Sequence, residues 1–206
     1  MSPKETSRKE REHQARRGEI LEAALKLFSQ KGYHQTSMSE IAKAAEFSIG
    51  SLYGFFKNKD ELFFTLFTEE IENIEKYVAE KTSGVSDPRE QLSTIAATLF
   101  DYFDTRWMAF NIFMMNRSSL DMSLKEEFGE TIHTKQIDFH KNLTEIIKQG
   151  IERGLFRALR PEEMAMTFQG LMNGSILVWM ESGRTYPLKE RVREIMDIFY
   201  RGVEKI

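Results

Sequence analysis

Apolar residues recur at spacings of three and four along most of this chain, and no segment alternates strictly between apolar and polar positions. The first pattern is typical of amphipathic helices, and strict alternation would indicate half-buried strands. Pro88, Pro161 and Pro187 each precede a helical pattern, where the first turn tolerates a residue without an N–H. We therefore predict an all-α protein of about nine helices, near residues 18–31, 38–45, 49–55, 59–82, 88–104, 106–117, 121–153, 161–182 and 188–204.

Two short helices joined by a tight turn are predicted within residues 36–59. Ser37 and Glu40 have the spacing of a capping box, so the first helix is expected to begin there. Ser48 is a suitable N-cap for the second helix. The pattern is that of a helix-turn-helix.

The second of these helices is expected to present two different faces. Leu52 and Phe56 are four residues apart and should face the core, whereas Ile49 and Tyr53 fall on another face. A short helix with small or polar residues at its start and an outward tyrosine suits a DNA major groove.

The chain around this motif resembles the DNA-binding domain of the tetracycline-repressor-like (TetR) family of transcriptional regulators. The resemblance runs from about Arg16 to about Ile74, and beyond it only the length and the helical pattern match. It is carried by matches in a single register: Ile20, Ala23, Ala24, Leu27, Phe28, Lys31, Gly32, Tyr33, Thr36, Ser37, Ile41, Ala42, Ala45, Ser48, Gly50, Leu52, Tyr53, Phe56, Lys57, Lys59, Glu61 and Leu62.

Three residues depart from the family pattern. Glu46 stands where the family often has glycine in the turn, so a residue with a side chain would carry strain there. Gly54 stands where a larger side chain is usual, and Phe55 where histidine or tyrosine is common. Because phenylalanine cannot donate a hydrogen bond to phosphate, that contact is in doubt.

The resemblance implies a set of DNA-binding residues. The expected phosphate contacts are Ser37, Ser39, Tyr53, Lys57 and Lys59. The residues expected near the bases are Ser48, Ile49, Gly50, Ser51 and Gly54. Phosphate contacts fix the register on the duplex, and contacts to base edges provide sequence specificity.

Composition and charge are compatible with this interpretation. With 41% hydrophobic and 30% charged residues, the chain has the composition of a globular protein. Residues 1–60 contain 11 Lys and Arg against 8 Asp and Glu, a net charge of +3, and the other 146 residues have a net charge of −6. The absence of cysteine excludes disulfides and thiolate metal sites, and no segment reads as a signal peptide or membrane span. We expect a cytoplasmic protein that does not associate with a membrane.

Three segments are expected along the chain: a flexible arm over residues 1–15, the helix-turn-helix domain over 16–60, and a ligand-binding and dimerisation domain over 61–206. The helix near 59–82 would link the two domains. A basic arm could enter a minor groove, but the interleaved acids favour solvated charges, and for Arg16 and Arg17 both interpretations stay open.

Aromatic and methionine side chains are dense in the C-terminal part. By resemblance, an inducer pocket lies there, and these side chains suit a largely apolar small molecule. The expected pocket residues are Phe103, Trp107, Phe110, Phe113, Met114, Phe139, Leu143, Phe168, Met172 and Trp179. The alternative for each residue is ordinary core packing.

The last two predicted helices are candidates for a dimer interface. Gly170 and Gly174 are four residues apart and would let another helix approach closely. By resemblance, these glycines with Val192, Ile195 and Phe199 contribute to a four-helix interface between two subunits. The alternative is that they close the core of their own subunit.

Catalytic and metal sites are weakly supported. Glu130 and His133 have the Glu-x-x-His spacing of di-iron bundles, but the one other copy lies in the N-terminal arm, so no metal site and no cofactor are expected. An all-α enzyme with a pocket around Trp107 and His140 remains an alternative, although no catalytic motif is present. A DNA-binding architectural protein without a ligand is another.

The sequence therefore predicts a non-enzymatic transcriptional regulator that consists of a three-helix helix-turn-helix domain and a C-terminal helical bundle. We expect a homodimeric repressor that binds a palindromic double-stranded DNA operator and is released by a small apolar effector.

Overall fold

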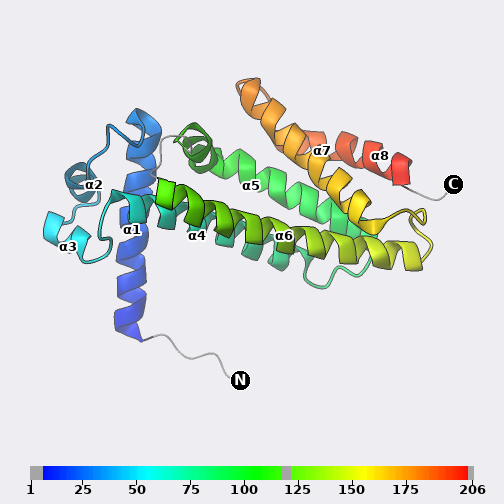
Figure 1. Ribbon diagram of the computed structural model, residues 1–206, viewed down its shortest axis with the longest axis horizontal. Helices are drawn as coiled ribbons and strands as arrows, with labels where there is room; N and C mark the ends of the chain where they lie inside the picture. Colours follow the sequence, from blue (N-terminus) through cyan, green and yellow to red (C-terminus); the bar gives the residue numbers. More distant parts are fainter. Residues whose placement is uncertain (1–6, 117–121, 204–206) are drawn as a thin grey trace. The chain divides into compact units, whose positions relative to one another are not determined.

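The computed structural model describes residues 7–116 and 122–203, and all regular elements within them are helical (Figure 1). The helices are α1 Arg8–Lys31, α2 Met38–Ala44, α3 Ile49–Tyr53, α4 Lys59–Thr82, α5 Pro88–Asn116, α6 Met122–Glu152, α7 Pro161–Glu181, the 3₁₀ helix η1 Leu188–Arg191, and α8 Val192–Val203. The predicted all-α class is confirmed.

Two elements differ from the prediction. Helix α1 begins at Arg8, ten residues earlier than expected, because Ser7 and Glu10 form a capping box in front of it. The two helices expected over 88–104 and 106–117 form the single helix α5, which is kinked where Arg106 leaves helical geometry (φ −114°, ψ 16°).

The chain divides into two compact units, one built from Met1–Glu70 and Met108–Phe128, the other from Ile71–Trp107 and Gly129–Ile206. In the first unit, α1 packs against α2, and α2 against α3. Fully buried Ile20, Ile41 and Leu52 contribute to its core. Rings from α1, the following loop and α4 meet around Phe63, whose centroid lies 5.4 Å from that of Phe28.

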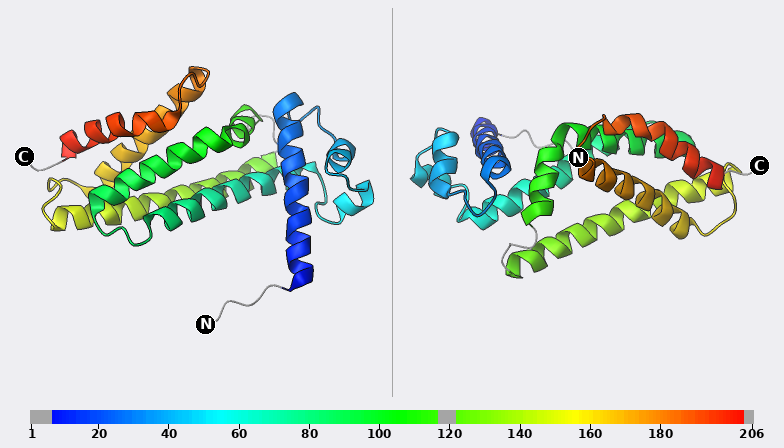
Figure 2. Two further views of the ribbon diagram at one scale, coloured as in Figure 1. Left: turned by 180° about the vertical axis from the view of Figure 1, so that it is seen from behind. Right: turned by 90° about the horizontal axis from the view of Figure 1, so that it is seen from above.

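The second unit has its own core, which combines residues of α4, α5, α6, α7, η1 and α8. Helices α7 and α8 lie side by side in both views of Figure 2. The junction before α8 is tied to α5, since the Asp104 carboxylate accepts the backbone N–H groups of Leu188 and Lys189 at 2.7 and 3.0 Å. The indole N–H of Trp179 donates to the carbonyl of Tyr186 at 2.7 Å, which holds the same junction against α7.

No helix within residues 7–116 and 122–203 is both long enough and apolar enough to span a membrane.

Candidate DNA-binding site

The start of α2 is fixed by the predicted capping box. The Ser37 hydroxyl accepts the N–H of Glu40 at 3.3 Å, and the Glu40 carboxylate accepts the N–H of Ser37 at 2.9 Å. Glu40 also pairs with Lys31 at the end of α1. The hydrogen bond from Lys31, followed by that from the Ser37 backbone, lowers the pKa of Glu40 from 4.5 to about 2. This carboxylate therefore joins α1 to the first turn of α2.

The turn between α2 and α3 contains a strained residue. Glu46 has φ +60°, a left-handed conformation that glycine adopts without penalty and other residues avoid. The backbone beside it is held by the N–H of Phe47, which donates to the carbonyl of Ala42 at 2.8 Å. The strain expected from the sequence at this position is confirmed.

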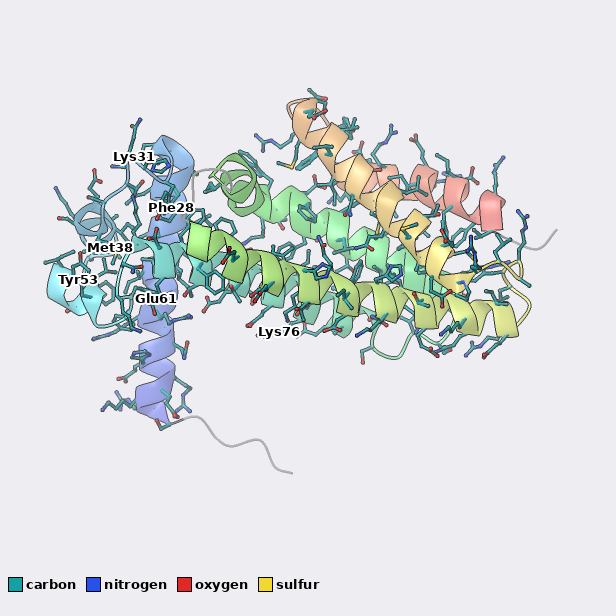
Figure 3. The ribbon with its side chains drawn as sticks, in the orientation of Figure 1. Phe28, Lys31, Met38, Tyr53, Glu61 and Lys76 are labelled. Atoms are coloured by element: carbon teal, nitrogen blue, oxygen red, sulfur yellow. The ribbon has the colours of Figure 1, made fainter. Side chains whose placement is uncertain are left out.

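Ser48 is the N-cap of α3, and its hydroxyl accepts the N–H of Ser51 at 3.1 Å and lies 2.8 Å from the Ser51 hydroxyl. Its two faces separate as expected, because Leu52 is fully buried whereas Ile49 and Tyr53 are 43% and 52% exposed. Tyr53 lies at the outer side of α3 (Figure 3). The side chains of Ile49 and Tyr53 are thus exposed to solvent on one face of this short helix.

The other expected contact residues are also accessible: Ser37, Ser39, Gly50, Gly54 and Lys57. Gly50 is surrounded by open space, and a Cβ at Gly54 would lie 3.1 Å from the carbonyl oxygen of Ser51. Backbone can therefore approach a ligand closely at Gly50, and at Gly54 a side chain would require a small shift. Their roles as DNA contacts stay predictions.

Lys59 makes hydrogen bonds within its own unit that the sequence did not indicate. Its ammonium donates to the carbonyls of Tyr33 and Thr36 at 2.8 and 2.9 Å and lies 4.2 Å from the centroid of the Tyr33 ring. Burial lowers the pKa of the Lys59 ammonium. The phosphate contact expected of Lys59 is not tested by this geometry, which instead gives the side chain a role in tying the start of α4 to the loop that precedes α2.

Two residues of α1 make contacts that the sequence did not indicate. Arg17 pairs with Glu69 of α4, and its guanidinium lies 5.6 Å from the centroid of the Phe56 ring. The His13 ring lies 4.6 Å from that of Phe55, which follows α3. One sequence signal for an earlier start of α1 is that His13 and Ile20 share a helical face. That signal is hard to recognise because the segment before Ile20 is highly charged.

The expected ligand-binding residues fall into three groups in the structure. Buried in the core of the second unit are Phe103, Leu143, Phe168, Met172 and Trp179, and half-buried beside it are Trp107 and Phe139. The side chains of Phe110, Phe113 and Met114 lie outside the described residues. The guanidinium of Arg184, a residue with φ +59°, stacks on the Trp107 indole at 3.2 Å from the ring centroid. The pocket assignment stays a prediction.

The expected dimer residues lie on different sides of α7 and α8. Gly170 and Gly174 are exposed, and a Cβ at either would meet nothing within 4 Å. Ile195 and Phe199 are instead buried in the core, and Val192 is half-buried. The outward residues are Met166, Leu177, Val178 and Ile198, all large apolar side chains between 49% and 61% exposed. Beside them, a groove of about 470 Å³ runs between α7 and α8, with Leu171 and Ile198 in its walls.

Within the described residues, no group of three or more histidine and acidic side chains could hold a metal ion. His133 is exposed on α6, and His140, seven residues later on the same face of the helix, is half-buried. Neither is joined to the carboxylates that a metal site would need.

Comparisons with known proteins agree with this geometry. Residues 20–66 match the family described as bacterial regulatory proteins, tetR family, and residues 85–203 match the tetracyclin repressor-like C-terminal domain. The transcriptional regulator YhgD of Bacillus subtilis is 28% identical over 87% of this chain and 92% of its own length. The fatty acid metabolism regulator of the same organism is 25% identical over 90% of this chain and 94% of its own. Among solved structures, the transcriptional regulator FadR from Bacillus subtilis in complex with stearoyl-CoA has a TM-score of 0.75 at 20% identity, covering 90% of this chain and 98% of that one.

Proposed function

Because the chain belongs to the tetracycline-repressor family of bacterial regulators, we propose that two copies of α3, one from each subunit of a dimer, occupy successive major grooves of a palindromic operator. The protein is a DNA-binding transcriptional regulator of the ligand-responsive, repressing type found in this family. The proposal concerns which of its residues carry out that function and which ligand relieves repression.

The observation that carries the proposal is the outward face of α3. Ile49 and Tyr53 are large, exposed and held by a helix whose opposite side is anchored by fully buried Leu52. Ile49 suits packing on a thymine methyl group, and the Tyr53 hydroxyl suits a phosphate oxygen. The exposed hydroxyls of Ser37 and Ser39 at the start of α2 are the further phosphate contacts that we propose.

For the effector, we propose a molecule with a fatty acyl chain. One sequence match and one structural match support this class, namely the match to a fatty acid metabolism regulator and the match to a regulator bound to stearoyl-CoA. The second unit is rich in aromatic and methionine side chains that accept flexible apolar ligands, including half-buried Trp107 and Phe139. We assign DNA binding to residues 16–60, and ligand binding and dimerisation to residues 61–206.

For the dimer, we propose that the outward face of α7 and α8 meets the same face of a second copy. Gly170 and Gly174 leave room for a partner helix, and Leu177, Val178 and Ile198 supply exposed apolar surface around them. A contact of this kind is isologous, as two-fold symmetry requires. Two-fold symmetry in the protein then matches the two-fold symmetry of the operator.

We also propose that the protein acts in the cytoplasm, where its operator is found, and that it has no enzymatic activity. Two relatives that match over 92% and 94% of their own lengths have names that describe a transcriptional regulator and a fatty acid metabolism regulator, which supports a regulatory role.

Calorimetry tests the proposed effector class. Saturated acyl-CoA thioesters of increasing chain length are titrated into the dimer with and without operator duplex, and free coenzyme A serves as the control. We expect affinity to rise with chain length and to fall in the presence of operator, by the same factor by which the ligand weakens operator binding. Phe139→Ala should change ligand affinity while leaving ligand-free operator affinity nearly intact. Binding of free coenzyme A as tight as that of the thioesters would contradict an acyl-chain pocket.

A further inference from the structure

The first part of α1 extends beyond the core of the helix-turn-helix. Ser7 caps the helix by accepting the N–H of Glu10 at 3.2 Å, so helical structure precedes buried Ile20 by about three turns. Figure 1 shows this lower half of α1 continuing past the level of α2 and α3. A segment whose one apolar residue before Ile20 is Ala15 therefore forms regular helix.

One edge of this extension carries three nitrogen donors. Lys9, His13 and Arg16 precede Ile20 at spacings of four, three and four, so all three lie on the helical face that Ile20 continues into the core. Each is exposed, and within residues 7–116 and 122–203 none has a side-chain hydrogen bond or ion pair. We call these three residues the α1 edge.

The neighbouring acids do not neutralise the α1 edge. Glu10 is used in the helix cap, where its carboxylate accepts the N–H of Ser7 at 2.7 Å. Glu12 pairs with Arg8 at 2.8 Å, on another face of the helix. The interleaved charges that suggest a balanced surface in the sequence are thus sorted by the helix into separate faces.

The α1 edge lies next to the C-terminal end of α3 within the same unit. The His13 ring is 4.6 Å from that of Phe55, which lies two residues after Tyr53 and 6.1 Å from the Phe47 ring in the turn before α3. One turn further along α1, Arg17 contacts Phe56. His13 is therefore fixed beside the C-terminal end of α3 with its ring nitrogens available.

We propose that Lys9, His13 and Arg16 form a second DNA contact, which binds backbone phosphates flanking the major groove that α3 enters. The inference rests on DNA binding by α3. Lys9 to Arg16 spans about 10 Å along the helix axis, and one strand of a duplex presents a phosphate about every 3.4 Å along its axis. Three donors on one straight edge suit such a row of anions, and they would act without reading base sequence.

The first test compares two variants that each lose two positive charges from α1. K9Q/R16Q removes charge from the α1 edge, whereas R11Q/K26Q removes it from other faces of the same helix. Affinity for operator duplex with extended flanks is measured by fluorescence anisotropy across a series of salt concentrations. We expect K9Q/R16Q to lower the salt slope by about two and to weaken binding about 100-fold, and R11Q/K26Q to change both far less. Equal effects of the two variants would overturn the proposal, because they would reflect net charge alone.

The second test isolates His13. H13F keeps a ring against Phe55 and removes the donor, whereas H13Q keeps an N–H donor and removes the ring. We expect H13F to weaken operator binding by about tenfold and H13Q to retain most of the affinity. Wild-type affinity in H13F, or an equal loss in both variants, would overturn the role of His13 as a donor. A Tyr53→Ala benchmark separates the proposals: if that variant loses affinity while K9Q/R16Q does not, DNA binding by α3 stands and the α1 edge fails.

Discussion

Replacing Lys59 by methionine separates a structural role of this residue from a phosphate contact. Methionine keeps much of the aliphatic stem and removes the ammonium, so the carbonyls of Tyr33 and Thr36 lose donors at 2.8 and 2.9 Å. A hydrogen bond to a charged donor contributes about 1.5–3 kcal/mol. Because Lys59 is only half-buried, solvent replaces part of that loss, and the desolvation that lowers the Lys59 pKa is also relieved. We expect a net destabilisation of about 2 kcal/mol.

Urea unfolding followed by circular dichroism measures this change, with Lys57→Met as the matched control, since Lys57 is exposed. Operator binding is measured in parallel as a function of salt. We expect Lys59→Met to lower the unfolding midpoint while leaving the salt slope near the wild-type value, and Lys57→Met to leave the midpoint unchanged. An unchanged midpoint together with a salt slope reduced by about one would show that the ammonium binds phosphate, and would refute this reasoning.

Three further predictions concern the turn, the cap and the dimer. Glu46→Gly should stabilise the protein by about 1 kcal/mol by relieving the left-handed backbone at φ +60°, whereas Glu46→Ala should not; equal thermal midpoints for the two variants would argue against strain. Because the pKa of Glu40 is lowered from 4.5 to about 2, the stabilisation by its carboxylate is present above pH 4.5 and is lost as the pH falls toward 2. The melting temperature of Glu40→Gln should therefore lie below that of wild type at pH 7, and the difference should vanish in acid. Gly174→Trp, at an exposed site where its own subunit leaves space, should yield a folded monomer by light scattering at micromolar concentration, and an intact dimer would exclude α7 from the interface.

The sequence predicts the helix-turn-helix well because its determinants are local. Ser37 with Glu40, and Ser48 before α3, are contacts within four residues, and the burial of Leu52 against the exposure of Tyr53 follows from helical periodicity alone. The capping box at Ser7 is equally local, but the charged residues after it show no apolar period. A cap without an amphipathic pattern predicts an arm, whereas Arg8–Lys31 forms a helix.

Contacts between distant residues account for most of what the sequence left open. Lys59 reaches carbonyls 23 and 26 residues away, and a lysine near a predicted DNA surface gives no sign of such partners. In α8, the apolar stripe with Ile195 and Phe199 is compatible from the sequence with either a dimer interface or the core of its own subunit, and in the structure it lies in the core of its own unit. An apolar stripe along a helix usually packs into the core of its own subunit. Exposed apolar residues such as Ile198, which could form an interface with another subunit, can be recognised only once the fold is known.

Selection of duplexes from a random DNA library tests the central claim most directly, because it requires neither a known operator nor a known effector. Wild type and Ile49→Ala are carried through the same rounds, and the enriched sequences are compared. We predict that wild type enriches an inverted repeat with half-sites about one helical turn or a multiple apart, and that Ile49→Ala loses discrimination at a thymine-containing position within each half-site. Enrichment of no sequence, or of an asymmetric site that Ile49→Ala leaves unchanged, would contradict a dimeric regulator that reads DNA with α3.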